Sequence, residues 1–148
     1  MKLEFKIKRF TELSADELYQ ILQLRSEVFI VEQNCVYQDI DGKDQKAIHV
    51  LGFLEEDLAA YCRLFDAGYY FDQASIGRVI VSPKHRDKKL GHDLMQVAIA
   101  TVAEEFNKTH ITISAQQYLQ RFYEGHGFVQ TSEMYLEDDI PHIEMKKQ

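Results

Sequence analysis

The chain has 148 residues, of which 45% are hydrophobic and 28% charged, a composition that excludes a fully disordered chain and predicts one domain over residues 1–148. Its formal net charge of −7 argues against a general nucleic-acid partner, because such binders usually carry a basic excess. Two cysteines, no apolar signal-peptide core and no run of roughly 18 apolar residues exclude a disulfide framework and a membrane span, so we expect a reduced, cytoplasmic protein.

The N-terminal part of the chain predicts a strand followed by a helix. Leu3, Phe5 and Ile7 alternate with charged residues, which predicts a strand with one buried face. Residues 14–17, Ser-Ala-Asp-Glu, form a capping box, in which a serine hydroxyl and a glutamate satisfy free N–H groups at a helix start. Apolar side chains then recur at helical spacing, so we expect a helix over residues 15–29.

A long loop and three strands are expected next. Residues 31–46 have little periodicity and predict a loop, which inside a compact domain is often functional. Residues 49–54 and 58–65 predict two strands joined by a turn at 55–57. A third strand over residues 74–81 ends before a proline.

The second half of the chain predicts two helices and three strands. Residues 90–106 form the longest amphipathic segment, followed by a short strand over 111–115 and a short helix near 118–124. Strands over 127–135 and 143–147 complete the sheet. The element order predicts an α/β (α+β) fold with a mixed sheet and helices, and excludes a helix bundle or a sandwich.

A basic segment between a buried strand and the longest helix carries a candidate anion site. After Pro83 the sequence is KHRDKKLG from Lys84 to Gly91, and Gly91 falls in the first turn of the helix. Free N–H groups at a helix N-terminus attract phosphate, and glycine lets a phosphate approach the backbone closely. Neither the P-loop motif nor the Gly-x-Gly-x-x-Gly dinucleotide motif is present in the sequence. The segment alone fits both a phosphate site and a solvated basic loop.

A second segment, together with the first, carries a resemblance to a known family. Residues 113–128, ISAQQYLQRFYEGHGF, predict a strand, a short helix with Phe122-Tyr123, and a turn before Phe128. In order and spacing, the two segments resemble the GNAT family of N-acetyltransferases. Its signatures are Gln/Arg-x-x-Gly-x-Gly/Ala after a strand and a later Asn-x-x-Ala-x-x-Phe-Tyr-x-x-x-Gly-Phe. Here Lys89 stands at the first glycine position, and the runs LRSEVFIVEQ and YQDID are similar to the ElaA-type subgroup.

The resemblance implies a GNAT-like, mostly antiparallel sheet and acetyl-CoA or coenzyme A as cofactor. Residues of the strand end, the basic loop and the later segment are expected at the cofactor: Val79, Ile80, Val81, Arg86, Asp87, Lys88, Lys89, Leu90, Gly91, His92, Asp93, Gln116 and Phe122. A free backbone N–H within 79–81 would polarise the thioester carbonyl. Tyr123 resembles the acid that protonates the leaving thiolate, its alternative being an aromatic packed on the sheet.

The acceptor side stays open at this point. The resemblance implies direct transfer to an amine of a small molecule or peptide, and the base has four candidates besides a water chain: Glu32, Asp41, His49 and His142. Each of them is also explained as a hydrogen-bonded or solvated polar residue. Arg25 fits either an anion-binding role toward the acceptor or a surface ion pair with Glu27. The histidines show no His-x-x-x-His spacing or Cys/His cluster, so no metal is expected.

Two other functions remain open from the sequence. A non-catalytic acyl-CoA sensor or interaction module would share the phosphate segment, although Tyr123 and the long loop favour catalysis. Residues 25–29, Arg-Ser-Glu-Val-Phe, are similar to part of the acyl-homoserine-lactone synthase pattern, but such enzymes are usually longer and the rest of the pattern is not evident. Exposed strand edges often pair in such folds, so a homodimer and a monomer are both open.

Overall fold

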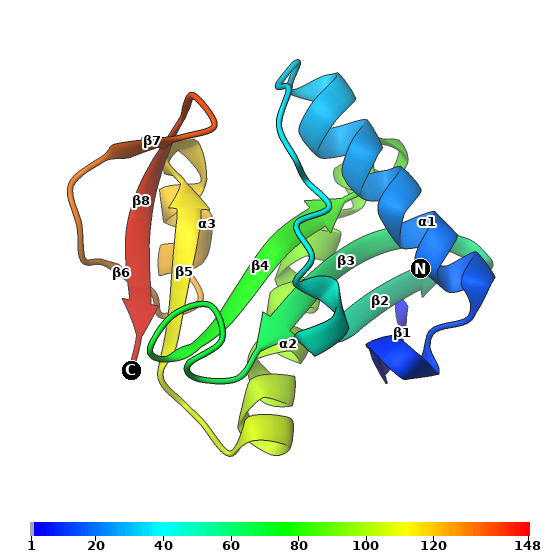
Figure 1. Cartoon of the computed structure of the whole chain (residues 1–148), viewed down its shortest axis with the longest axis horizontal. Coiled ribbons are helices and arrows are strands. Elements are labelled where there is room, and N and C mark those ends of the chain that lie inside the picture. Colours follow the sequence, from blue (N-terminus) through cyan, green and yellow to red (C-terminus); the bar gives the residue numbers. More distant parts are fainter. Residues whose placement is uncertain (1) are drawn as a thin grey trace.

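A single mixed sheet runs through the molecule, and its two halves separate near the middle (Figure 1). The computed structural model describes residues 2–148. Within them the strand order is β1-β2-β3-β4-β5-β8-β6, with β7 paired to β8. The strands are β1 (Glu4–Arg9), β2 (Ile48–Leu54), β3 (Asp57–Phe65), β4 (Ala74–Val81), β5 (Ile111–Gln116), β6 (Val129–Gln130), β7 (Tyr135–Glu137) and β8 (Ile140–Lys147).

Helices cover both faces of this sheet (Figure 1). The α-helices are α1 (Ala15–Arg25), α2 (Leu90–Phe106) and α3 (Gln120–Glu124). A π-helical segment, Ser26–Glu32, follows α1 directly. Short 3-10 turns occur at Phe10–Glu12, Asp44–Lys46, Pro83–Lys88 and Gln117–Leu119. Within residues 2–148, no helix is long and apolar enough to cross a membrane.

The junction between β4 and β5 opens the sheet. These two strands are parallel, and α2 forms the crossover between them. They are paired only at Ala74–Ile111 and Ser75–Thr112. Beyond Ser75 the two strands diverge, so that the carboxyl-terminal part of β4 lacks a strand partner on that side (Figure 1). The position of the functional site follows from this separation.

The core consists of two apolar layers, one on each face of the sheet. On one face, Leu94, Ala98 and Val102 of α2 are fully buried with residues of β2–β5 and β8. On the other face, Ile21 and Leu24 of α1 pack on neighbouring strands. The central strands contribute side chains to both layers, because successive residues of a strand point to opposite faces of the sheet. Each fully buried leucine or isoleucine contributes about 1.5–3 kcal/mol.

The predicted fold class and element order are confirmed, with differences at particular segments. The first helix ends its α-helical part at Arg25, whereas the prediction extended it to residue 29; the chain continues as the π-helix. The wider π turn keeps Val28 and Phe29 buried against the sheet. Ile7 is 41% exposed although it shares the alternation of Leu3, because β1 is an edge strand with a neighbour on one side only.

The C-terminal strands also differ from the prediction. Residues 127–135 do not form one continuous strand, since β6 covers only Val129–Gln130 and the chain returns to the sheet at β7. The backbone N–H of Thr131 donates to the Glu144 carbonyl at 2.9 Å, and the Glu144 N–H donates to the Ser132 hydroxyl at 2.9 Å. Here the Ser132 hydroxyl takes the place of a backbone carbonyl as acceptor, which interrupts the backbone hydrogen bonds between β6 and β8. The last strand begins at Ile140, three residues earlier than predicted.

Candidate active site

A cavity of about 590 Å³ lies where β4 and β5 diverge. One wall consists of β4, the start of α2, and the end of β5 with α3. The opposite wall consists of the π-helix, the loop that follows it, and the β7–β8 turn. Small-molecule sites usually measure about 300–1,000 Å³ and carry a few polar groups on an apolar lining. The cavity therefore has the size and position of a ligand site.

A bulge in β4 shapes this cavity. Tyr61 of β3 pairs with Ile80 and Arg63 pairs with Gly77, so β4 carries one extra residue between these pairs. Arg78, in the bulge, has a φ of 53°, a left-handed conformation that costs a non-glycine residue about 1–2 kcal/mol. Its side chain is held by Asp39, because the Arg78 Nε donates to Asp39 Oδ1 at 2.8 Å. Bulges bend the bulged strand, and this one lies where β4 leaves β5.

The N-terminus of α2 borders the cavity. Its N-cap residue, Lys89, has φ 57° and ψ 37°, a left-handed conformation that glycine adopts without a steric penalty. This explains why glycine is usual at this position in the family that the sequence resembles. Within the described chain, no side chain caps α2, so its first backbone N–H groups have no side-chain acceptor. Together with the helix dipole, these N–H groups favour an anion.

Gly91, in the first turn of α2, has a packing role as well. A Cβ atom at this position would lie 3.3 Å from two carbons of the Phe122 ring and 3.8 Å from Val81 Cγ2. The ring of Phe122 therefore packs directly on the start of the helix. Phe122 also meets the Tyr123 ring edge-on, with centroids 5.1 Å apart. The two sequence segments thus meet at one point of the cavity wall.

Tyr123 is buried, with 6% of its surface exposed, and it lines the cavity. Its ring is held between Phe122 and Phe128, the latter edge-on at a centroid distance of 6.0 Å. Burial raises the pKa of Tyr123, so the hydroxyl keeps its proton at neutral pH. A phenol that keeps its proton on the wall of a ligand cavity can donate that proton to a bound group.

Most residues predicted at the cofactor line this cavity: Val79, Ile80, Val81, Arg86, Lys89, Leu90, Gly91, Gln116 and Phe122. Four others do not line it: Asp87, Lys88, His92 and Asp93. The carboxylate of Asp87 lies 3.5 Å from the Lys88 ammonium at the surface, and the His92 Nδ1 lies 2.9 Å from His126 Nε2.

An ion pair crosses between the two walls of the cavity. The Arg86 guanidinium donates to Glu32 at 2.5 and 2.7 Å, and its Nε donates to the Val81 carbonyl at 3.2 Å. The hydrogen bonds from Arg86 lower the pKa of Glu32. Glu32 lines the cavity, but its carboxylate is ionised and occupied by Arg86, which does not fit a free base.

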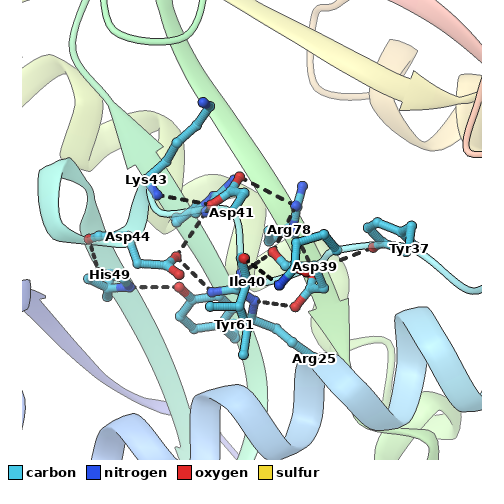
Figure 2. A network of polar contacts seen from close by, with 12 residues as sticks. Arg25, Tyr37, Asp39, Ile40, Asp41, Lys43, Asp44, His49, Tyr61 and Arg78 are labelled. Atoms are coloured by element: carbon cyan, nitrogen blue, oxygen red, sulfur yellow. Dashed lines mark hydrogen bonds and ion pairs between the residues drawn. The ribbon is translucent and has the colours of Figure 1, made fainter.

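A buried charge network holds the loop after the π-helix against the sheet (Figure 2). Arg25 is fully buried; its Nε donates to Asp39 at 3.0 Å and its Nη1 to Asp44 at 2.7 Å. Arg63, 1% exposed, donates to Asp44 at 2.9 Å and to Asp41 at 2.6 Å. With Arg78 on Asp39, each buried guanidinium has a carboxylate partner, as buried charges require, while the Arg63 Nε has no hydrogen-bond partner within residues 2–148.

The network accounts for three of the residues considered for the acceptor side. Arg25, Asp41 and His49 do not line the cavity. The His49 Nε2–H donates to the Asp44 carbonyl at 2.9 Å, and its Nδ1 accepts from the Tyr61 hydroxyl at 2.6 Å. Burial lowers the pKa of His49, which keeps this ring neutral. Their placement fits a structural role and does not fit contact with an acceptor, because their polar atoms are already bonded.

The remaining candidate, His142, lines the cavity from β8. Sequence analysis missed several other polar residues that line this cavity: Tyr37, Arg78, Ser114, Glu137 and Asp138. One signal was available for the last two, because Glu137 precedes an Asp-Asp pair. Asp138 and Asp139 have φ of 51° and 64°, the conformation of a tight hairpin turn. The place of this turn near β5 is set by the tertiary fold and cannot be predicted from the local sequence.

Comparisons with known proteins agree with this geometry. The family model described as "Acetyltransferase (GNAT) domain" matches residues 11–148. The chain is 41% identical over 148 residues to the protein ElaA of Escherichia coli, which covers 99% of this chain and 97% of ElaA. The crystal structure of E. coli ElaA is similar, with a TM-score of 0.92, 40% identity and 99% of both chains covered. A structure described as an acyl-CoA N-acyltransferase from Pseudomonas aeruginosa is similar too, with a TM-score of 0.92, 42% identity and 99% of both chains covered.

Proposed function

Because the chain belongs to the GNAT acetyltransferase family, as an ElaA-like member, we propose that it transfers an acetyl group from acetyl-CoA to a primary amine. The acceptor is an amine of a small molecule or peptide, and the transfer is direct, within a ternary complex. One observation carries the proposal: a single cavity joins the free N-terminus of α2, the buried Tyr123 hydroxyl and a separate polar wall.

The basic end of the cavity suits the pyrophosphate of coenzyme A. The N–H groups at the start of α2 would donate to phosphate oxygens, and the basic residues Lys89 and Arg86 line the same cavity. The left-handed Lys89 turns the chain into the helix at this point. When bound, the cofactor supplies an acyl thioester; the chain supplies the groups that hold and polarise it.

The end of β4 supports catalysis of the transfer. Beyond Ser75, β4 has no strand partner toward β5, so N–H groups within 79–81 are candidates to donate to the thioester oxygen as negative charge develops. Tyr123 would give its proton to the departing thiolate. A thiol has a pKa of about 8.5 in water, below that of tyrosine. Burial raises the pKa of Tyr123 and so makes it a weaker acid; desolvation of a thiolate formed in the same cavity raises the pKa of the thiol too, and this second effect favours passage of the proton to sulfur.

Thiol release tests this function directly. Purified protein is mixed with acetyl-CoA and a panel of primary amines, and free thiol is followed against a reaction without protein. We expect amine-dependent release for at least one amine, with N-acetylated product found by mass spectrometry. Binding of coenzyme A by calorimetry without turnover on any amine would favour a non-catalytic acyl-CoA-binding module instead.

The Tyr123→Phe variant tests the acid. Removing one hydroxyl keeps the ring packed on Phe122 and Phe128, so the calorimetric affinity for coenzyme A should stay unchanged. We expect kcat to fall by about 100-fold, the lower range for loss of general acid–base catalysis. Wild-type turnover by the variant across pH 6–9 would rule out this role for Tyr123.

A further inference from the structure

The cavity lining contains one base candidate, His142, whose ring nitrogen Nε2 makes no hydrogen bond to the described residues and lies 3.5 Å from Glu137 Oε2. Deprotonation is required, because a primary alkylamine has a pKa of about 10.4 and arrives as an ammonium ion at neutral pH. Of the four side chains that the sequence offered, Glu32 is bonded to Arg86, and Asp41 and His49 belong to the buried network. His142 lies on β8 beside the cavity and is 6% exposed.

The hydrogen bond at the other ring nitrogen sets the state of His142. The His142 Nδ1 lies 2.7 Å from the Ile140 carbonyl, an acceptor, so Nδ1 carries the proton in the neutral ring. The lone pair then resides on Nε2, which is the nitrogen that a base needs. Tyr135, the cross-strand partner of His142, stacks on the ring at a centroid distance of 6.2 Å and an angle of 22°. The ring is therefore fixed in position as well as in tautomer.

A carboxylate lies next to that free nitrogen. Glu137 Oε2 is 3.5 Å from His142 Nε2, close enough to stabilise an imidazolium ion that forms on proton uptake. The Glu137 side chain is 42% exposed and lines the same cavity, so it also attracts an incoming ammonium group. The neighbouring Asp138 of the β7–β8 turn adds a second carboxylate to the cavity lining.

Glu137 is itself held by a chain of hydroxyl groups. The Ser114 hydroxyl donates to Glu137 Oε1 at 3.0 Å. Since the one proton of Ser114 is used there, Ser114 accepts from the Tyr135 hydroxyl, which lies 2.5 Å away. Burial raises the pKa of Tyr135, which keeps this phenol a donor. The hydrogen bonds therefore run in one direction: Tyr135 donates to Ser114, and Ser114 donates to the Glu137 carboxylate.

We infer that His142 is the base of the acyl transfer and that Glu137 stabilises its charged form, an assignment that rests on the proposed function. The ammonium first loses one proton, through Glu137 and solvent, to give the free amine. The amine nitrogen attacks the thioester carbon; the C–N bond forms, the C–S bond breaks, and His142 Nε2 takes the second proton. The thiolate takes a proton from Tyr123, and solvent carries a proton from His142 back to Tyr123.

Polar groups of two strands surround the ring of His142. It faces the Glu137 carboxylate and the Tyr135 phenol on β7 and the Ile140 carbonyl on its own strand, and Arg78 of β4 lines the same cavity. Removing the charge of Glu137 should lower kcat, because the imidazolium that forms during the transfer loses its nearby negative partner.

The experiment compares kcat of four proteins between pH 5.5 and 9, at saturating acetyl-CoA, with the best primary amine of the thiol-release panel. We expect kcat of His142→Gln to fall by about 100-fold or more. Its affinity for coenzyme A by calorimetry should stay unchanged. Glu137→Gln should lower kcat less. His110→Gln, an exposed histidine before β5, is the matched control and should behave as wild type.

Two further measurements separate chemistry from structure. Added imidazole should restore part of the activity of His142→Ala, which a purely structural loss would not allow. A ¹⁵N spectrum of the wild-type histidines at neutral pH should show His142 protonated on Nδ1. If wild type turns over while His142→Gln keeps its kcat and pH profile, or if His142 is protonated on Nε2 alone, the assignment is wrong and the proposed function stands. If wild type transfers to no amine, the proposed function fails and the assignment with it.

Discussion

At the scale of single residues, the start of α2 shows how a backbone conformation selects a residue type. Lys89 adopts a left-handed conformation where the family usually has glycine, and it is one of the residues that line the cavity. The left-handed conformation costs lysine about 1–2 kcal/mol. Relative to glycine this cost is partly offset, because a chain with glycine loses more conformational entropy on folding, worth about 0.4–1 kcal/mol. Lysine at this position therefore lowers the stability of the fold somewhat and adds a cationic residue near the proposed phosphate site.

The Lys89→Gly variant separates these two effects. Its free energy of unfolding in urea should equal that of wild type or exceed it by up to about 1.6 kcal/mol. Its dissociation constant for coenzyme A should rise several-fold, because the ammonium is lost from the cavity wall. Lys88→Ala is the control, since Lys88 does not line the cavity, and its affinity should be unchanged. Equal affinities of wild type and Lys89→Gly would show that the ammonium does not contact the cofactor.

At the scale of elements, two ionic contacts fix α1 and the loop that follows the π-helix. The buried network around Arg25 holds the loop over the sheet, and one wall of the cavity depends on it (Figure 2). At the other end of α1, Glu17 accepts from the Lys8 ammonium at 2.8 Å and from the Ser14 N–H at 2.9 Å. The capping box thus ties the start of the helix to β1.

The Arg25→Met variant tests the network. Methionine fills similar space but leaves Asp39 and Asp44 each without one donor in a buried site. Breaking a buried ion pair by removing one partner costs about 3–5 kcal/mol, and we expect a loss in this range by urea denaturation. Lys43→Met, an exposed side chain on the same loop, is the control and should change the free energy of unfolding by less than about 0.5 kcal/mol. A similarly small loss for Arg25→Met would show that the network does not hold the loop.

The Glu17→Gln variant tests the link to β1 through its pH dependence. Burial opposes ionisation of Glu17, but hydrogen bonds from Lys8 and Ser14 outweigh it and lower its pKa from 4.5 to about 2. A carboxyl whose pKa is lower in the folded state stabilises the fold above its unfolded pKa. The contribution is therefore complete above about pH 4.5 and is lost as the pH falls toward 2. Urea unfolding of Glu17→Gln should show a flatter pH dependence over that interval, whereas exposed Glu104→Gln should follow wild type.

At the scale of the whole molecule, a separation in one sheet creates the site. The half from β1 to β4 contains α1 and the charge network. The half with β5 and β8 contains the His142–Glu137 pair, and Tyr123 lies close to these strands on α3. The two halves also meet across the cavity, where the Cys35 thiol lies 3.1 Å from the Asp138 carbonyl. Residues of the cofactor end and residues of the acceptor wall are thus brought together from both halves.

The sequence predicted those parts of this arrangement that depend on local periodicity and spacing. The limits of β4 and α2 are as predicted. The basic loop and Phe122-Tyr123 were singled out because their order and spacing resemble the GNAT signatures. The π-helix was missed because its apolar residues also fit an α-helical pattern. The charge network and the Glu137–His142 pair were missed because their members come from separate strands and loops, and only the tertiary fold brings them together.

The central claim is that the cavity between β4 and β5 binds coenzyme A through the N-terminus of α2. Titration of ¹⁵N-labelled wild-type protein with coenzyme A tests it most directly, by the changes in amide chemical shift. We predict the largest changes at Lys89, Leu90 and Gly91, with further changes along residues 79–81 and around Tyr123. Largest changes at a distant surface, such as the depression beside Ile7 and Glu105, would contradict the claim, and so would an absence of changes at saturating concentration.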